Sequence, residues 1–409
     1  MRPSDLFWPG DERAGDAMSE AALVDAMTRV EAAWLAALAN AGIADGSDGL
    51  RGLVGDTDVD AIAVDAESGG NPVQPMVSLL RERLRDRDQR AAAWLHRGLT
   101  SQDVLDSAIV LCIRDACAIV RRELSHQIDA LSDMSQRHRG DVMAGRTLGQ
   151  SAVPITFGLK AASWLQGVLD AYEGLSLTDR LPAQFGGAAG TLAAPTALAV
   201  DAGVADPPHA AQAIAVDCAT SLGLVPSPPW HTSRAPITRV GDALVRCTDA
   251  WGHVANDVIA LSRPETAELA EPVGRGGSST MPHKQNPVLS VLIRRAALAA
   301  PATASQLHLA AADSHDERSA GAWHVEWAAL RTLTRHTVTA ASQATELLTG
   351  LRVDTARMRT NAEADSADLL AERDSISSAT GDIGTYLGAT ELVIDAALDR
   401  ARPHQGADL

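Results

Sequence analysis

Apolar side chains recur at helical spacing near the start of the chain. Between residues 19 and 41 they return every third or fourth position, and Gly42 then supplies a stop. These apolar positions are Leu23, Met27, Val30, Trp34 and Leu38. The spacing predicts one amphipathic helix, and residues 77–84, preceded by Pro72 and Pro75, predict a second, shorter one.

The longest helical pattern begins at Thr100 or Ser101. Either residue can cap the helix, Asp103 adds negative charge to its first turn, and the pattern runs almost to Gly140. About 35 residues at ~1.5 Å each would span roughly 50 Å. A helix of this length is typical of helical bundles and coiled coils.

Three further long helical patterns cover residues 155–175, 236–261 and 287–350, with breaks expected near Pro301 and at residues 314–321. Gly- and Pro-rich segments at 181–190 and 225–231 are expected to be loops. No series of alternating strands is visible.

The fold class predicted from these patterns is all-α. We expect an N-terminal helical cap over residues 1–98 and a central long-helix bundle over 99–350. A shortened helical domain over 351–409 completes the chain. Long helices with apolar stripes on more than one face cannot all be covered inside one narrow bundle, so oligomerisation is also expected.

Composition supports the helical prediction and limits the partners. Apolar residues make up 46% of the chain but aromatic residues only 3%, which suits close helix packing better than a β-sandwich. The formal charge of −17 repels nucleic acid and anionic lipid surfaces. No apolar run approaches the length of a membrane span, and the N-terminus has no signal-peptide pattern, so a soluble, cytoplasmic protein is expected.

The four cysteines show neither a CxxC pair nor zinc-ligand spacing, and they are too sparse for a disulfide scaffold. We expect buried, reduced thiols. The histidines form no HExxH motif and the Gly-rich segments follow no predicted strand, so no metal and no cofactor are expected.

The candidate chemistry lies in the segment 273–287, between two long helical patterns. It reads VGRGGSSTMPHKQNP: a glycine hinge, two serine hydroxyls, then Lys284 and Asn286. Such a segment offers a proton acceptor beside a carboxylate-binding pair. A solvated loop without function is the alternative.

This string resembles the GSSxMPxKxNP signature loop of the fumarase/aspartase superfamily. Residues 96–103 (HRGLTSQD) are similar to the first motif of that superfamily, and residues 145–158 (GRTLGQSAVPITFG) to the second. The resemblance implies a fumarase/aspartase-like fold in which the long helices form a core of roughly 20 helices in a homotetramer. It also implies that each site is shared between subunits.

Three other strings resemble the 3-carboxy-cis,cis-muconate cycloisomerases within that superfamily. They are QFGGAAGTL at 184–192, PWHTSR at 229–234 and SAGAWHVEW at 319–327. The function implied is lactonisation of a small anionic polycarboxylate in the protocatechuate branch of the β-ketoadipate pathway. Proton exchange at the carbon α to a carboxylate would pass through an aci-carboxylate.

The resemblance also assigns roles to residues. Ser278 would exchange the proton, with His96 as a second catalytic residue, although a structural or subunit-contact role is the alternative for this histidine. Lys284 and Asn286 would hold the substrate carboxylate. The other expected substrate-binding residues are Thr100, Ser101, Arg146, Gln150, Ser279, Met281, His231 and Arg234, and a structural role is equally open for the last two.

One departure from the pattern concerns the leaving group. Many lyases of the superfamily have Thr-His where this chain has Thr147-Leu148, and that histidine is associated with protonation of the leaving group. An amine needs a proton to leave, whereas a carboxylate with a pKa of about 4 does not. Leu148 therefore fits lactone chemistry and counts against an ordinary aminosuccinate lyase.

Two alternatives stay open. A β-elimination lyase could release fumarate from a substituted succinate with a weakly basic leaving group such as nitrite, and less readily from an adenylosuccinate-type substrate. A non-enzymatic structural relative is the other alternative, against which the intact set of Ser278, Lys284 and Asn286 argues.

Overall fold

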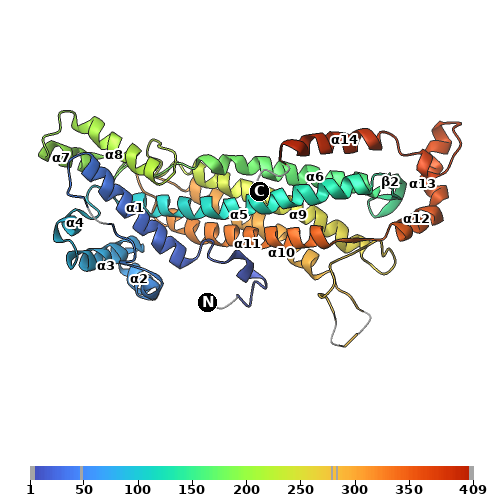
Figure 1. Ribbon diagram of the computed structural model, residues 1–409, viewed down its shortest axis with the longest axis horizontal. Coiled ribbons are helices and arrows are strands. Elements are labelled where there is room, and N and C mark those ends of the chain that lie inside the picture. Colours follow the sequence, from blue (N-terminus) through green and yellow to red (C-terminus); the bar gives the residue numbers. More distant parts are fainter. Residues whose placement is uncertain (1–4, 47–48, 278–279, 282–283, 405–409) are drawn as a thin grey trace.

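The computed structural model describes residues 5–46, 49–277, 280–281 and 284–404. It has an elongated helical body with five long helices packed side by side (Figure 1). They are α5 (Ser101–Arg137), α6 (Phe157–Gly174), α9 (Ala235–Leu261), α10 (Val288–Ala312) and α11 (Ala322–Gly350). The all-α prediction is confirmed.

Six further helices, all but α1 shorter than those of the bundle, cover its end where α5 begins. They are α1 (Glu20–Asn40), α2 (Val59–Gly69), α3 (Val73–Arg85), α4 (Gln89–Trp94), α7 (Ala193–Asp201) and α8 (Pro207–Ser221). Although α7 and α8 come from the middle of the sequence, they lie beside α1 at this end (Figure 1). Helix α1 also packs along α5, so the N-terminal part is joined closely to the bundle.

The other end of the bundle carries the small sheets and the C-terminal helices. These elements are β1 (Val142–Thr147), β2 (Gln150–Thr156), β3 (Leu269–Ala270), β4 (Arg352–Val353), α12 (Thr355–Ala364), α13 (Ser366–Ile376) and α14 (Thr390–Ala401). Strands β1 and β2 form an antiparallel hairpin, and β3 pairs with β4. A small apolar cluster joins β1 to α12 and α13, while α14 runs back along α6.

Local sequence explains how two of the helices begin. The Ser19 hydroxyl accepts the backbone N–H of Ala22 at 3.0 Å and so caps α1, which lies within the predicted range 19–41. The Asp103 carboxylate accepts the backbone N–H of Thr100 at 3.1 Å and so closes the first turn of α5. The four cysteines are buried and free, as expected.

Two local predictions were wrong. Helix α10 continues through Pro301 without a break, because this residue lies on an exposed face while the helix is held along its length by α9 and α11. The β1–β2 hairpin was not foreseen, since its apolar residues do not alternate regularly and a register shift lies between Ala144 and Arg146.

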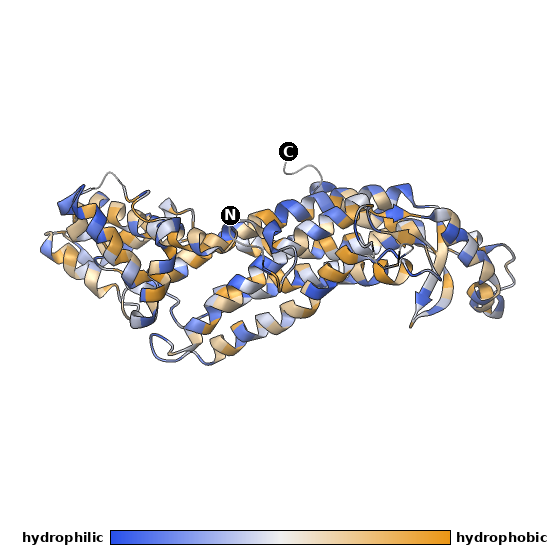
Figure 2. Ribbon diagram, turned by 90° about the horizontal axis from the view of Figure 1, so that it is seen from below, coloured by the Kyte–Doolittle hydropathy of each residue, from blue (hydrophilic) through white to orange (hydrophobic). Residues whose placement is uncertain are grey.

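Helix α10 exposes large apolar side chains. The exposed fractions are 51% for Val291, 71% for Leu298 and 69% for Leu309. Figure 2 shows apolar residues interspersed with polar ones along the outer helices of the bundle. By length and composition α10 could also cross a membrane, a test that core helices of soluble proteins pass as well.

Candidate active site

Four strings that are distant in the sequence meet at the N-terminal end of α5. Asp103, in the first turn of this helix, is buried and organises them. Its carboxylate accepts the backbone N–H groups of Gly186 and Gly187, both at 2.9 Å. These hydrogen bonds hold the string at 184–192 against the first motif. In this position the Gln184 side chain faces His231.

The hydrogen bonds around His231 determine which ring nitrogen carries the proton. The backbone N–H of Trp230 donates to Gln184 Oε1 at 2.6 Å, which fixes the orientation of the Gln184 amide. Gln184 Nε2 is then a donor, and it lies 3.0 Å from His231 Nε2 and 3.3 Å from Asp103 Oδ1. A neutral His231 ring therefore accepts at Nε2 and carries its proton on Nδ1, while Asp103 Oδ1, 3.4 Å from Nε2, would pair with a protonated ring.

Arg234 is buried between two carboxylates. Its guanidinium donates to Asp106 at 2.7 and 3.1 Å and to Glu326 at 2.6 Å, and Nη1 also donates to the carbonyl of His231. Trp323 donates its indole N–H to Asp106 at 2.9 Å. The Nε of Arg234 also donates to Glu326, at 3.0 Å, so all five N–H groups of the guanidinium are used inside the protein and the structure places this predicted substrate ligand in a scaffold behind His231.

The buried cluster contains two carboxylates, of Asp106 and Glu326, but only one guanidinium, of Arg234. Burial raises the pKa of Glu326, although its hydrogen bond and ion pair with Arg234 act in the opposite direction. Burial disfavours the charge on Arg234 as well, but Asp106 and Glu326 outweigh that effect and raise the pKa of the guanidinium. The arginine therefore stays charged and holds the two carboxylates together.

His96 lies just before α5 with its backbone in the left-handed region, at φ 64°. Its Nδ1 is 2.6 Å from Oε1 of Glu31, which is on α1 and buried. Thr100 and Ser101 follow at the start of the helix. Arg318, from the segment before α11, donates to the Thr100 hydroxyl and, at 3.2 Å, to Gln102 Oε1.

The second motif forms the tip of the β1–β2 hairpin. Leu148 and Gly149 both have positive φ, at 51° and 82°, as a tight two-residue turn requires. The Leu148 side chain is 104% exposed, and Gln150 is exposed beside it. A leucine at this tip can neither donate nor accept a proton.

Arg146 lies lower on the same hairpin and is already paired. It donates to both carboxylate oxygens of the buried Glu268, at 2.7 and 3.0 Å. Asn361, on α12, donates to the same carboxylate at 2.8 Å. In one chain, therefore, this predicted substrate ligand has its charge balanced by a buried carboxylate.

The signature loop is closed at its base by Asn286. Its backbone N–H and side-chain Nδ2 both donate to the carbonyl of Gly276, at 2.9 and 3.0 Å. Lys284 and Met281 are exposed beyond this closure, and the Lys284 N–H donates to the Met281 carbonyl at 3.0 Å. The predicted residues Ser278 and Ser279 lie outside the described residues.

The two groups of motif residues lie at opposite ends of α5. This helix has 37 residues and so measures roughly 55 Å. His96, Thr100 and Ser101 lie at its start, whereas the hairpin lies past its end and the signature loop projects from the bundle near that same end (Figure 1). One chain therefore does not bring the first motif to the second motif or to the loop.

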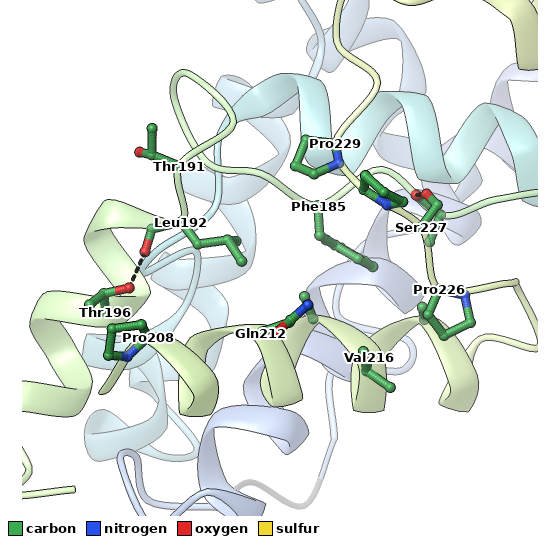
Figure 3. Close-up of a pocket in the computed structure, with 14 residues that line it drawn as sticks. Phe185, Thr191, Leu192, Thr196, Pro208, Gln212, Val216, Pro226, Ser227 and Pro229 are labelled. Carbon is green, nitrogen blue, oxygen red and sulfur yellow. Dashed lines mark hydrogen bonds between the residues drawn. The ribbon is translucent and has the colours of Figure 1, made fainter. Parts of the chain in front are cut away.

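Two cavities lie near these groups. One of about 540 Å³ is at the base of the signature loop, where Glu271, Arg275, Asn286 and Arg352 contribute to its wall. Another of about 470 Å³ lies between α7, α8 and the string at 184–192 (Figure 3). Phe185 faces this second cavity, which none of the predicted site residues lines.

Several residues of the site were missed although their strings were recognised. These residues are Asp103, Gln184 and Glu326, which lie within the strings quoted above. The feature that marks them is the burial of a polar side chain, and burial is visible only in the structure. Arg318 was also missed, and it lies directly before the string at 319–327. Among the residues that the structure describes, no group of three His, Cys, Asp or Glu side chains is arranged to hold a metal ion.

Comparison with known proteins places the chain in a family. Residues 12–301 match the model of a family described as lyase. A nitrosuccinate lyase from Streptomyces davaonensis is 41% identical over 365 residues, 87% of this chain and 76% of the relative. A 3-carboxy-cis,cis-muconate cycloisomerase from Bradyrhizobium diazoefficiens is 39% identical over 320 residues, 77% of this chain and 68% of the relative.

Solved structures give the same result. The 3-carboxy-cis,cis-muconate lactonizing enzyme from Pseudomonas putida superimposes with a TM-score of 0.82 at 28% identity, covering 96% of this chain and 97% of the other. A fumarate lyase from Mesorhizobium sp. BNC1 gives a TM-score of 0.81 at 26% identity, covering 97% and 100%. The chain is thus an enzyme of the lyase family that constitutes the fumarase/aspartase superfamily.

Proposed function

We propose that this enzyme makes or breaks a bond at the carbon β to a substrate carboxylate, with a leaving group that departs as an unprotonated anion. Leu148 carries the proposal: it is exposed at the hairpin tip, and in the superfamily motif that this string resembles the position often holds a histidine. The first substrate we propose is 3-carboxy-cis,cis-muconate, whose own carboxylate adds across the adjacent double bond to form a lactone.

Three residues of the signature loop have separate roles in the proposed chemistry. Ser278 exchanges the proton at the α carbon, and its alkoxide character requires donors that stabilise the oxyanion. Lys284 and Asn286 hold the carboxylate, which carries two negative charges once the α-proton has left. Fixed donors at this position act mainly on that high-energy species.

The proposed site is shared between the subunits of a homotetramer. The separation of the motifs along α5 and the exposed apolar residues of α10 support this arrangement, since a second copy can cover the helix and bring its own first motif to the loop. Thr100, Ser101, Arg146, Gln150, Ser279, Met281 and His231 are proposed around the substrate. We also propose a cytoplasmic location and no nucleic-acid, membrane, metal or cofactor partner.

The decisive experiment mixes the purified protein with 3-carboxy-cis,cis-muconate and follows the loss of its diene absorbance. The Ser278→Ala variant should lose turnover by orders of magnitude while size-exclusion chromatography shows an unchanged tetramer. Turnover confined to amine-leaving succinates would overturn the proposal. Near-normal turnover of the variant would remove Ser278 from the chemistry.

Nitrosuccinate is the second candidate substrate. The relative named nitrosuccinate lyase is 41% identical to this chain, against 39% for the cycloisomerase from Bradyrhizobium diazoefficiens. Nitrite, like a carboxylate, leaves without a proton, so Leu148 is compatible with both substrates. Formation of fumarate and nitrite from nitrosuccinate, measured in parallel, decides between them.

A further inference from the structure

The pair formed by Glu31 and His96 joins two elements that are distant in the sequence. Glu31 lies in the middle of α1, and its side chain is fully buried. Its Oε1 is 2.6 Å from His96 Nδ1, while its Oε2 has no hydrogen-bond partner among the described residues. Burying a carboxylate with one unpaired oxygen costs free energy, and the ion pair with the His96 ring offsets part of that cost.

The turn that carries His96 is fixed from several sides. The indole N–H of Trp34 donates to the carbonyl of Arg97 at 2.7 Å, and Arg81 donates to the carbonyl of Leu95 at 3.0 Å. The left-handed backbone at His96 is uncommon for a residue other than glycine. This backbone geometry is therefore held by contacts on both sides of the histidine.

We infer that Glu31 is a positioning residue for the reaction. By holding Nδ1 of His96, it leaves the Nε2–H of the charged ring to donate a hydrogen bond to an anionic group of the substrate. The inference rests on the proposed function, in which His96 faces an anionic substrate. No partner of Nε2 is found among the described residues. The ring retains partial exposure, with 22% of its side chain accessible.

Charges on the neighbouring elements favour the imidazolium overall. Burial favours the neutral ring, but the hydrogen bond and charge of Glu31 outweigh burial and raise the pKa of His96 above its ordinary value. Asp103 on α5 acts in the same direction, and Arg81 on α3 opposes it. His96 therefore keeps its positive charge to a higher pH than an isolated histidine does.

Kinetics of Glu31→Gln test the inference, since glutamine can still accept from Nδ1 but lacks the charge. We expect kcat/KM to fall about ten- to a hundredfold and its alkaline limb to move to lower pH. Because Glu31 acts through His96, the double variant Glu31→Gln/His96→Gln should be no worse than His96→Gln alone. The matched control is Asp25→Asn, an exposed carboxylate on the same helix, which should leave the pH profile unchanged.

A second measurement separates this inference from the substrate assignment. Thermal unfolding of the wild type, both single variants and the double variant gives the coupling between residues 31 and 96 without any turnover. A folded-state pKa above the unfolded one makes the coupling full at acidic pH, and it is lost as pH rises through the folded value. Multiplicative kinetic losses, an unmoved alkaline limb or a pH-independent coupling would each overturn the inference.

Discussion

The two ends of the bundle treat their polar residues in opposite ways. At the start of α5, Asp103, His231 and Arg234 are buried, and their hydrogen bonds are made within one chain. At the far end, Gln150 and Lys284 are exposed on the hairpin and the loop, although Arg146, lower on the same hairpin, is paired with the buried Glu268. The first end has its polar groups paired within one chain, whereas the second leaves several of its predicted substrate ligands exposed to solvent.

Because of this difference, we expect substitutions at the buried end to change stability and those at the exposed end to change turnover. Substitutions at the buried end leave charges or hydrogen-bonding groups uncompensated inside the protein, so they act first on folding. Substitutions at the exposed end remove groups that the folded chain does not need. They should act on the reaction alone, and four variants test this contrast.

Arg234→Met should have the largest effect. It leaves Asp106 and Glu326 buried without their cation, and we expect the free energy of unfolding to fall by about 3–5 kcal/mol in urea titration. The loss should shrink at acidic pH, because burial has already raised the pKa of Glu326 and protonation removes its charge. Arg239→Met, at an exposed position on α9, is the control, and equal losses for both variants would contradict the contrast.

Lys284→Met should act on turnover instead. Removing one fixed donor to the charged intermediate should lower kcat about 10²–10³-fold, with an unchanged thermal midpoint. Gln285→Met, at the neighbouring exposed position, should keep most of the activity. A Lys284→Met protein that unfolds early would show that the exposed end also supports the fold.

Gly276→Ala should distort the closure of the loop. Gly276 has φ 76°, and a Cβ there would lie 2.0 Å from the backbone oxygen of Asn286. The strain should lower kcat/KM about tenfold through displacement of Lys284 and Asn286. Gly277→Ala is the matched control, because a Cβ at residue 277 would meet nothing within 4 Å; similar losses in both would argue against a role for the closure.

Leu148→His should have the smallest effect on the proposed reactions. The side chain is exposed and histidine tolerates positive φ, so stability should not change. Because an anionic leaving group needs no proton, kcat should change by less than about threefold. A large gain in the rate with 3-carboxy-cis,cis-muconate or nitrosuccinate would mean that protonation limits the reaction after all.

The sequence predicted the fold better than the contacts within the site. Helical periodicity located α1, and α5 begins where Thr100 and Ser101 predicted it. Periodicity does not state how each helix is rotated against its neighbours. The contact between Glu31 and His96, across 65 positions, and that between Arg146 and Glu268, across 122, could therefore not be read from spacing.

The prediction for Arg234 shows the same limit. Its string was recognised, but a motif states only which residue types occur and not whether a guanidinium faces substrate or two buried carboxylates. Likewise, Pro301 predicted a break that packing against α9 and α11 overrides. Burial and helix rotation, which arise only in three dimensions, decided each of these cases.

The exposed hairpin tip has a consequence for how this enzyme family diversifies. The Leu148 side chain is fully exposed, so residues that tolerate its left-handed backbone, at φ 51°, can replace it at little cost in folding free energy. Natural drift at residue 148 can therefore sample new leaving groups while the buried end stays constant. For the same reason, a saturation library at this single position is an economical place to begin directed evolution of new substrates.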